Sequence, residues 1–262
     1  MAQIRIENLR KQFGSFTAVQ SSSFTIEDGE FFMLLGPSGC GKTTTLRMMA
    51  GLELPTSGQI YLDGEEVGQK PASQRDIAFV FQMFALYPHM NVRGNISYPL
   101  KSQGMPRAQI RAKVAEVAEI LGITDILDRP VGGLSGGDRQ RVALGRAIVR
   151  DPKAFFMDEP LGALDALTRE KMQSLVLELW KETGKTIIII THSVEEALLL
   201  GERLFVMAPR PGRIHKEYNL PFAERGLTES LRAIKQDKAF SKVREEILTM
   251  IWNMEEEIMG RV

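Results

Sequence analysis

The sequence predicts an α/β fold with a mixed or parallel sheet, an antiparallel β edge and an inserted helical part. Three observations lead to this prediction. From residue 31 onward, short apolar runs typical of buried strands are followed by amphipathic stretches typical of helices. Residues 3–28 instead alternate apolar and polar side chains and break at glycine, as antiparallel strands do. Residues 88–150 begin with Pro and Gly breaks and continue with helical spacing, which indicates a mostly helical insertion.

The composition is that of an ordinary globular protein. The 262 residues are 44% hydrophobic and 25% charged, enough for one large or two modest domains. Lys and Arg number 33, as do Asp and Glu, so no global field favours nucleic acid or an anionic membrane. No basic-then-apolar signal opens the chain, and its apolar runs fall far short of the ~18 residues that span a bilayer. We therefore expect no nucleic-acid partner, and membrane association only through another protein.

A glycine-rich loop between a predicted strand and a predicted helix is the centre of the sequence. The strand is Phe31–Leu35, the loop Gly36–Thr43 fits G-x-x-x-x-G-K-[ST], and the helix runs over Thr44–Ala50. Glycines let backbone N–H groups surround an anion, and the helix N-terminus adds its positive dipole end. Lys42 is expected to reach the β- and γ-phosphates, and the Thr43 hydroxyl to ligate Mg²⁺. The residues expected to bind nucleotide here are Gly36, Pro37, Ser38, Gly39, Cys40, Gly41, Lys42, Thr43 and Thr44.

The loop has two alternative interpretations, an accidental glycine-rich turn and a redox-sensing cysteine. An accidental glycine-rich turn would fit the pattern in about one chain in a hundred of this length, and the flanking strand and helix make it rarer. Cys40 is the only cysteine, so no disulfide framework forms, which suits a reducing cytosol. As a redox sensor Cys40 lacks a resolving partner.

A second glycine-flanked helix start lies at Leu134–Arg141. Ser135 with Asp138 three residues later predicts a capping box, followed by an amphipathic helix. This helix end is also an anion site in principle. The alternative is simply a well-capped helix, which the phosphate loop elsewhere in the chain disfavours.

Polar side chains follow three predicted strands. Asp158 and Glu159 end the strand Ala154–Met157; Asp158 is expected to hold the Mg²⁺ shell, and Glu159 to position or deprotonate water. His192 follows the strand Lys185–Ile190, where α/β sites form. Gln82, after the strand Asp76–Phe81, could join Mg²⁺ to an attacking water. The alternatives are a solvated acidic turn, a structural histidine and a loop glutamine bonded to backbone.

The rest of the sequence predicts one further candidate site residue, Phe13, and the remaining helices, strands and turns. Phe13 either packs in a turn or stacks on an adenine, and the sequence favours neither. A helix is expected over Arg107–Leu121, and a pair of surface-packing helices over Ser230–Met259. The remaining expected elements are a strand at Gln59–Leu62, a hairpin turn at Asp63–Gly64, helices at Ala166–Glu182 and from Glu195 to Leu200, a last strand at Arg203–Ala208 and a turn at Pro209–Gly212.

Taken in order, these elements resemble the ATP-binding cassette (ABC) ATPases, the nucleotide-binding subunits of ABC transporters. The resemblance covers residues 3–215. The matching segments are Gly36–Thr43 (Walker A), Gln82 (Q-loop), Leu134–Asp138 (signature), Ala154–Asp158 (Walker B) with Glu159 after it, Leu161–Asp165 (D-loop) and His192 (H-loop).

The resemblance implies a P-loop NTPase core with an ABC-type antiparallel β subdomain and an inserted helical subdomain. It also implies a head-to-tail dimer, expected to be of two identical chains, that holds two ATP molecules with Mg²⁺ between subunits. Ser135, Gly136 and Gly137 would bind the γ-phosphate across the dimer. Glu159 would act on water, with His192 and Gln82 completing the site, and Thr43, Gln82 and Asp158 would surround the metal. Two departures stand out: Asp138 replaces the usual Gln of the signature, and Phe13 an aromatic that is often Tyr.

The resemblance further implies an importer subunit at the cytoplasmic face of the inner membrane. It would act on a separate permease, whose coupling helix would dock at Phe84–Asn95, and indirectly with an extracytoplasmic solute-binding protein. Leu164–Arg169, Thr191–Ala197 and Pro209–Ile214 are similar to the nitrate, sulfonate and taurine importers, whereas Tyr87–Ile96 is similar to the sugar and glycerol-phosphate group. The first group is preferred because the segment after Ile214 is too short for the regulatory domain that sugar-importer ATPases carry.

Three alternatives remain: a sugar-type importer ATPase, a soluble ABC regulator or assembly factor, and a P-loop small-molecule kinase. The kinase hypothesis gives the signature segment and His192 no role. In domain terms, residues 1–215 are expected to form the ATPase domain, with the helical subdomain at 88–150 inserted in it, and residues 216–262 a short helical extension.

Overall fold

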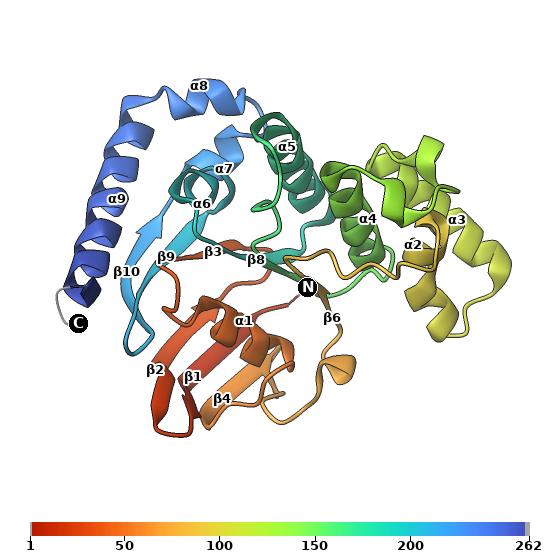
Figure 1. Ribbon diagram of the computed structural model, residues 1–262. Coiled ribbons are helices and arrows are strands. Elements are labelled where there is room, and N and C mark those ends of the chain that lie inside the picture. Colours follow the sequence, from red (N-terminus) through yellow and green to blue (C-terminus); the bar gives the residue numbers. More distant parts are fainter. Residues whose placement is uncertain (1, 260–262) are drawn as a thin grey trace.

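The computed structural model describes residues 2–259, in which two sheets are covered by helices (Figure 1). The smaller sheet is antiparallel, in the order β2-β1-β4-β5. Its strands are β1 (Ile4–Phe13), β2 (Phe16–Ile26), β4 (Ser57–Leu62) and β5 (Glu65–Glu66). The predicted antiparallel edge and the hairpin turn at Asp63–Gly64 are both present. The fold-class prediction is confirmed.

The larger sheet has the order β10-β9-β3-β8-β7-β6. Five of its strands run parallel, namely β3 (Phe31–Leu35), β6 (Ile77–Val80), β7 (Ala154–Asp158), β8 (Thr186–Thr191) and β9 (Arg203–Ala208). The expectation that Arg203–Ala208 is the last strand was wrong. The chain turns back into β10 (Arg213–Asn219), which pairs antiparallel with β9. This strand crosses residue 215, so the sheet itself extends to Asn219.

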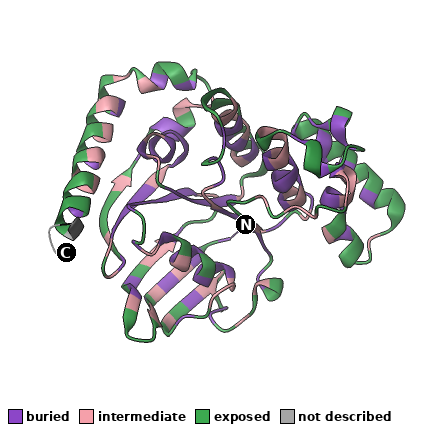
Figure 2. Cartoon of the chain, in the orientation of Figure 1, coloured by how far each residue is buried: buried purple, intermediate pink, exposed green. Residues whose placement is uncertain are grey.

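Successive residues of the central strands point to opposite faces of the larger sheet, and each face has its own core. Phe32 and Leu34 pack with α1 (Lys42–Ala50) and the smaller sheet. Phe31 and Met33 pack with the helices of the other face. Among these helices are α5 (Ala166–Thr183) and α6 (Val194–Leu200). Figure 2 shows the buried strands between these two covered faces. The sheet thus fixes the strand ends that carry the predicted site residues.

The helical insertion projects from the β6–β7 side of the sheet (Figure 1). It contains α2 (Val92–Ser102), α3 (Arg107–Ile120) and α4 (Gly136–Ile148), with 3-10 turns at Thr124–Ile126 and Val131–Gly133. Another 3-10 turn, Ala72–Gln74, lies outside the insertion and precedes β6. The predicted apolar stripe of α3 is buried, since Ile110, Val114 and Val117 are each less than 10% exposed. A helical insertion is therefore present where the sequence places it.

The C-terminal segment folds over α6 as separate helices. After α7 (Phe222–Arg225), α8 (Leu231–Lys235) and α9 (Lys238–Met259) are divided at Gln236–Asp237. The Ser230 hydroxyl caps α8, and the Asp237 carboxylate accepts the backbone N–H of Ala239 at 2.8 Å, which favours a new helix start. The expected helix pair is present. None of the helices within residues 2–259 is long and apolar enough to cross a membrane.

Arg75 is a buried cation that ties the C-terminus of α1 to the loops below it. Its guanidinium donates to the carbonyls of Met48 (2.7 Å), Met49 (2.9 Å) and Gly68 (3.1 Å), and its Nε to that of Lys70 (2.8 Å). The side chain is 1% exposed, and burial lowers its pKa to about 10. Arg75 therefore neutralises orphan carbonyls at the end of the helix that the phosphate loop begins.

Replacing Arg75 by methionine is expected to destabilise the protein by about 3 kcal/mol, because buried carbonyls lose charged donors. Chemical denaturation of the two proteins measures the difference. Arg75→Lys keeps the charge but not the fork of donors, so we expect it to recover only part of the loss. Equal stability of Arg75→Met and the parent would contradict this role.

Candidate functional site

The predicted phosphate loop lies between β3 and α1, as the sequence indicates. Gly39 and Gly41 have φ angles of 76° and 92°, which side-chain-bearing residues rarely adopt. A Cβ atom at Gly41 would also lie 2.9 Å from the carbonyl oxygen of Ala18. Lys42 is buried, and its ammonium donates to the carbonyls of Gly36 at 2.6 Å and Pro37 at 3.1 Å. The loop therefore holds a lysine ammonium directly beneath the backbone that would surround a phosphate.

Cys40 lies inside this loop. The side chain is fully buried, with its Sγ atom 3.7 Å from the Lys42 ammonium. Burial raises the pKa of the thiol, and the Lys42 charge opposes this only in part. A protonated thiol is a weak nucleophile, so this geometry favours a packing role over redox chemistry.

Thr43 and Asp158 are brought together from α1 and the end of β7. The Thr43 hydroxyl donates to Asp158 Oδ1 at 3.4 Å. Burial raises the pKa of the Asp158 carboxyl, and the neighbouring Glu159 charge adds to the effect. A hydroxyl and a carboxylate beside a phosphate loop are oxygen ligands of the kind that Mg²⁺ takes. Within residues 2–259 no cluster of three His, Cys, Asp or Glu side chains could hold a metal by itself, so phosphate and water oxygens would have to complete the shell.

Glu159 is the point at which three predicted catalytic residues meet. Its Oε2 accepts a hydrogen bond from the Gln82 amide at 3.0 Å and lies 3.1 Å from His192 Nδ1. Glu159 itself has a positive φ of 45° and its N–H donates to the carbonyl of Ile190 in β8. The ends of three neighbouring parallel strands, β6, β7 and β8, thus supply an amide, a carboxylate and an imidazole at one place. This is an arrangement that could orient and deprotonate a water.

Ser135 begins α4 at the exposed end of the helical insertion. Its hydroxyl oxygen accepts the backbone N–H of Asp138, as the predicted capping box requires. The reciprocal bond to the Ser135 backbone is absent among the described hydrogen bonds; instead the Ser135 hydroxyl donates to Asp138 Oδ2 at 2.7 Å. Gly137 lies against α5, where a Cβ atom would be 2.5 Å from Thr168. No hydrogen bond within residues 2–259 joins Ser135, Gly136 or Gly137 to the phosphate loop.

Phe13 ends β1 and pairs with Phe16 at the turn into β2. Its ring is 48% exposed, and the Lys11 ammonium lies 4.8 Å from the ring centroid. A half-exposed ring has not been used up by core packing, which favours the stacking interpretation over turn packing. The stacking role stays a prediction.

Sequence reasoning missed Arg146, which connects α4 to the segment after Gln82. Its guanidinium donates to the carbonyls of Ala85 at 2.5 Å and Phe84 at 3.1 Å and lies over the Tyr87 ring. Phe84 and Ala85 have positive φ angles of 60° and 47°, so this turn is held in an unusual conformation. A lone arginine in an amphipathic helix carries no sequence signal for such a contact.

Sequence reasoning also missed Glu196 of α6, a carboxyl 2% exposed whose Oε1 has no hydrogen-bond partner. Burial raises its pKa to about 7, against lowering by the Thr191 hydroxyl, Arg169 and His192. Arg169 in turn donates to the carbonyls of Leu161 and Leu164. Glu196 is therefore a buried neighbour of His192 and, through Arg169, of the Leu161–Asp165 turn.

Stability is expected to fall as pH rises from about 4.5 to about 7, because the unfolded chain releases the Glu196 proton while the folded chain keeps it. Below this range both states are protonated, and above it the full cost of about 3 kcal/mol applies. Glu196→Gln cannot ionise, so it should gain stability over the parent at pH 8 and not at pH 4.5. Thermal melts across this range measure it. Parallel melting curves for the two proteins would contradict the buried-carboxyl account.

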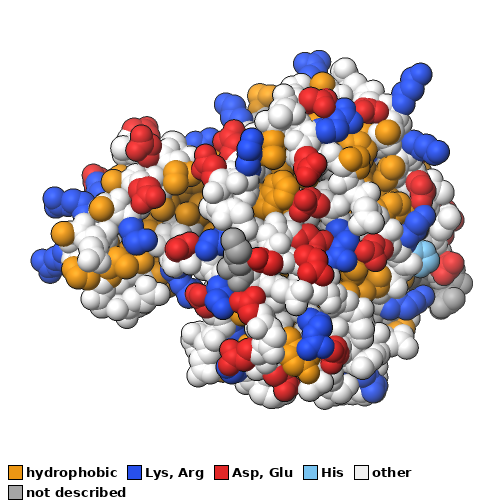
Figure 3. Space-filling view, turned by 180° about the vertical axis from the view of Figure 1, so that it is seen from behind, with side chains coloured by type: hydrophobic (Ala, Val, Ile, Leu, Met, Phe, Trp, Pro, Cys, Tyr) orange, Lys and Arg blue, Asp and Glu red, His pale blue; other side chains and the backbone are white. Residues whose placement is uncertain are grey.

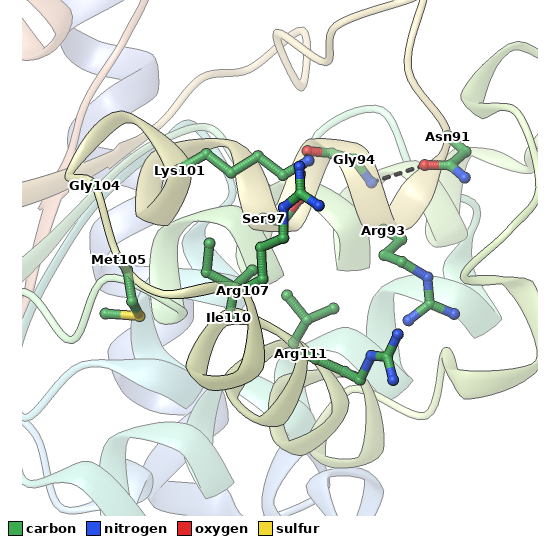
Figure 4. A pocket seen from close by; sticks show the side chains of 11 residues that line it. Asn91, Arg93, Gly94, Ser97, Lys101, Gly104, Met105, Arg107, Ile110 and Arg111 are labelled. Atoms are coloured by element: carbon green, nitrogen blue, oxygen red, sulfur yellow. Dashed lines mark hydrogen bonds between the residues drawn. The ribbon is translucent and has the colours of Figure 1, made fainter.

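A large cavity, about 1090 Å³, lies away from these residues, between α2 and α3 (Figure 4). Arg93, Lys101, Arg107 and Arg111 border it, and Ile110 forms part of its apolar wall. Arg93 is already held by Asp128 through two hydrogen bonds. On the rear face of the molecule, acidic and basic side chains are interspersed (Figure 3). Size alone therefore does not identify the site; the converging polar groups at the strand ends do.

Comparison with known proteins agrees with this geometry. Residues 19–162 match the family model described as "ABC transporter". The chain belongs to the ABC transporter family. The predicted resemblance is confirmed, and with it the assignment as an ABC ATPase.

Individual relatives refine the match. The taurine import ATP-binding protein TauB of Jannaschia sp. (strain CCS1) is 55% identical over 266 residues, covering 100% of this chain and 98% of that protein. The trehalose/maltose import ATP-binding protein MalK of Thermococcus litoralis is 53% identical over 213 residues, covering 79% of this chain and 57% of that protein. Among solved structures, a dimeric post-hydrolysis state of the ATP-binding cassette MJ0796 bound to ADP and Pi has a TM-score of 0.74 at 31% identity, covering 83% of this chain and 98% of that one.

Proposed function

We propose that this chain is the ATP-hydrolysing subunit of an importer for taurine or a closely related sulfonate. The observation that carries the proposal is the full-length match to a taurine import ATP-binding protein at 55% identity. The match to the sugar-importer relative is nearly as high in identity but covers 57% of that protein. The taurine-type relative aligns with 100% of this chain and along 98% of its own length, so the taurine-type assignment is preferred over the sugar-type one.

ATP hydrolysis follows from the arrangement of the strand ends. Lys42 exchanges the carbonyls of Gly36 and Pro37 for phosphate oxygens when nucleotide enters, because a charged ammonium binds phosphate more strongly than a neutral carbonyl. Thr43, Asp158 and Gln82 would hold Mg²⁺, which would supply positive charge to offset the negative charge of the phosphates. Glu159 takes the proton of the attacking water, and Gln82 and His192 fix the orientation of its carboxylate.

The working unit we propose is a homodimer. The exposed N-terminus of α4, at Ser135–Gly137, has the features of a phosphate site, but no hydrogen bond within residues 2–259 joins it to the phosphate loop of its own chain. A head-to-tail pair brings this end to the nucleotide of the other copy and explains why one chain carries both halves of a site. The related cassette MJ0796 has been solved as a dimer with ADP and Pi.

The permease would dock beside the segment after Gln82. A cavity of about 550 Å³ there is lined by residues from several parts of the chain, among them Phe81, Ala85, Tyr87, Tyr98 and Arg146. A coupling helix seated in it would touch the same turn that Arg146 fastens to α4. Docking would thus reach both Glu159, through Gln82, and Ser135, through α4. We propose a location at the inner face of the membrane, held by the permease, with a solute-binding protein acting from the other side.

Uptake of labelled taurine by cells that produce the transporter tests this function. Removing this subunit should abolish taurine uptake, the parent chain should restore it, and Glu159→Gln should not. Labelled maltose and nitrate serve as competing solutes of the alternative groups. Loss of maltose uptake with unchanged taurine uptake would replace the taurine assignment by the sugar-type one.

A further inference from the structure

Asp138 occupies the signature segment at a place where the structure gives it an unusual effect. The Ser135 hydroxyl accepts the Asp138 N–H at 3.1 Å and donates its own proton to Asp138 Oδ2 at 2.7 Å. The single proton of this hydroxyl and one of its two acceptor lone pairs are thereby engaged within one turn of α4. The same hydroxyl is the group that the proposed dimer presents to the γ-phosphate of the other copy.

Two physical consequences follow. To donate to a γ-phosphate, the Ser135 hydroxyl must give up its charge-assisted bond to Asp138. In addition, the Asp138 carboxylate already satisfies the positive end of the 13-residue helix α4, so an arriving phosphate meets a negative charge within one helical turn. Both effects oppose binding of ATP at this helix end and leave binding at the Lys42 loop unaffected.

We propose that Asp138 keeps the N-terminus of α4 from binding the γ-phosphate of the other copy. It thereby raises the ATP concentration at which two copies form the nucleotide-bound dimer. The inference rests on the composite site proposed above and assigns a regulatory role to one residue within it. A symmetric dimer contains two Ser135–Asp138 pairs, so the free-energy cost of dimer formation includes both. Closure then depends on additional binding energy, which a docked permease can supply through Arg146 and α4.

Sedimentation of the full chain in the Glu159→Gln background, titrated with Mg²⁺ and ATP, tests the proposal. Asp138→Asn keeps an oxygen that accepts the Ser135 hydroxyl and removes only the charge. We expect it to lower the ATP concentration for half-maximal dimer formation by about tenfold. The difference from the parent should shrink as salt is raised, because the repulsion is screened.

Three variants make the comparison specific. Asp138→Glu keeps the charge and should need at least as much ATP as the parent. Glu116→Gln removes one negative charge from the exposed face of α3, away from any site residue, and should titrate like the parent. Asp138→Gln is a second neutral variant that should behave like Asp138→Asn should the latter fold poorly.

The outcomes separate this inference from the proposed function. If Glu159→Gln itself stays monomeric at saturating ATP, the composite site fails and Asp138 has nothing to regulate. If Glu159→Gln forms the dimer and neither neutral variant lowers the ATP requirement, the role of Asp138 is overturned and the ATPase proposal stands. A lower requirement in Glu116→Gln as well would reduce the effect to net charge and also overturn it.

Discussion

Alanine in place of Lys42 is expected to reduce ATP turnover at least a hundredfold and to weaken ATP binding. The Lys42 ammonium is buried under the phosphate loop and, without nucleotide, is held by the carbonyls of Gly36 and Pro37. It is the cation placed to meet the β- and γ-phosphates. Removing a charged donor from a preorganised site typically costs a factor of about 10² or more in rate.

Phosphate release and fluorescent-ATP binding by the purified chain measure the two effects. Lys181→Ala, an exposed position in the last turns of α5, is the matched control for loss of one lysine and should keep the parental activity. A thermal melt of Lys42→Ala checks that the loop carbonyls tolerate the loss of their donor. Parental ATPase activity in a folded Lys42→Ala would refute the phosphate-binding role of this loop.

Glutamine in place of Glu159 is expected to lower turnover by about 10²–10⁴-fold while ATP still binds. The substitution preserves the shape of the side chain and its contacts with Gln82 and His192, but an amide oxygen cannot take the proton of the attacking water. Because the γ-phosphate is then not cleaved, the ATP-bound dimer should persist.

Single-turnover hydrolysis and retention of labelled ATP on gel filtration measure this variant. Glu178→Gln, on an exposed part of α5, controls for the loss of one carboxylate and should hydrolyse ATP at the parental rate. Turnover in Glu159→Gln equal to the parent would show that another group acts as the base.

The elements that carry the site were predictable because their signals are local. The loop Gly36–Thr43 combines a glycine pattern with its flanking strand and helix, and Asp158–Glu159 ends a strand recognisable from four consecutive apolar residues. The loop follows β3, and the two carboxylates lie at the end of β7. Because these strands are parallel, their carboxyl ends lie at the same end of the sheet. The convergence of Gln82 and His192 on one oxygen of Glu159 is the part that only coordinates can give.

The features that were missed depend on contacts between distant segments. Strand β10 has the mostly polar sequence Arg213–Asn219, which shows little apolar alternation because it lies at the edge of the sheet. Arg75 reaches the carbonyls of α1 from more than 20 residues away, and Arg146 reaches Ala85 across 61 positions. The expected capping box at Ser135 differs for a subtler reason: the shorter Asp side chain reaches the hydroxyl of Ser135.

The central claim is that one copy of the chain supplies the phosphate loop and another supplies Ser135 to the same ATP. Two differently tagged Glu159→Gln chains test it, one with Ser38→Cys and the other with Gly132→Cys, three residues before Ser135, where a side chain has open space. Both positions are exposed, whereas the native Cys40 is fully buried and should not react with a short bifunctional thiol reagent.

We predict a cross-linked product containing one chain of each tag when Mg²⁺ and ATP are present, and none without nucleotide or when the Ser38→Cys chain also carries Lys42→Ala. A protein that is saturated with ATP yet stays monomeric and gives no product between the two chains would contradict the account.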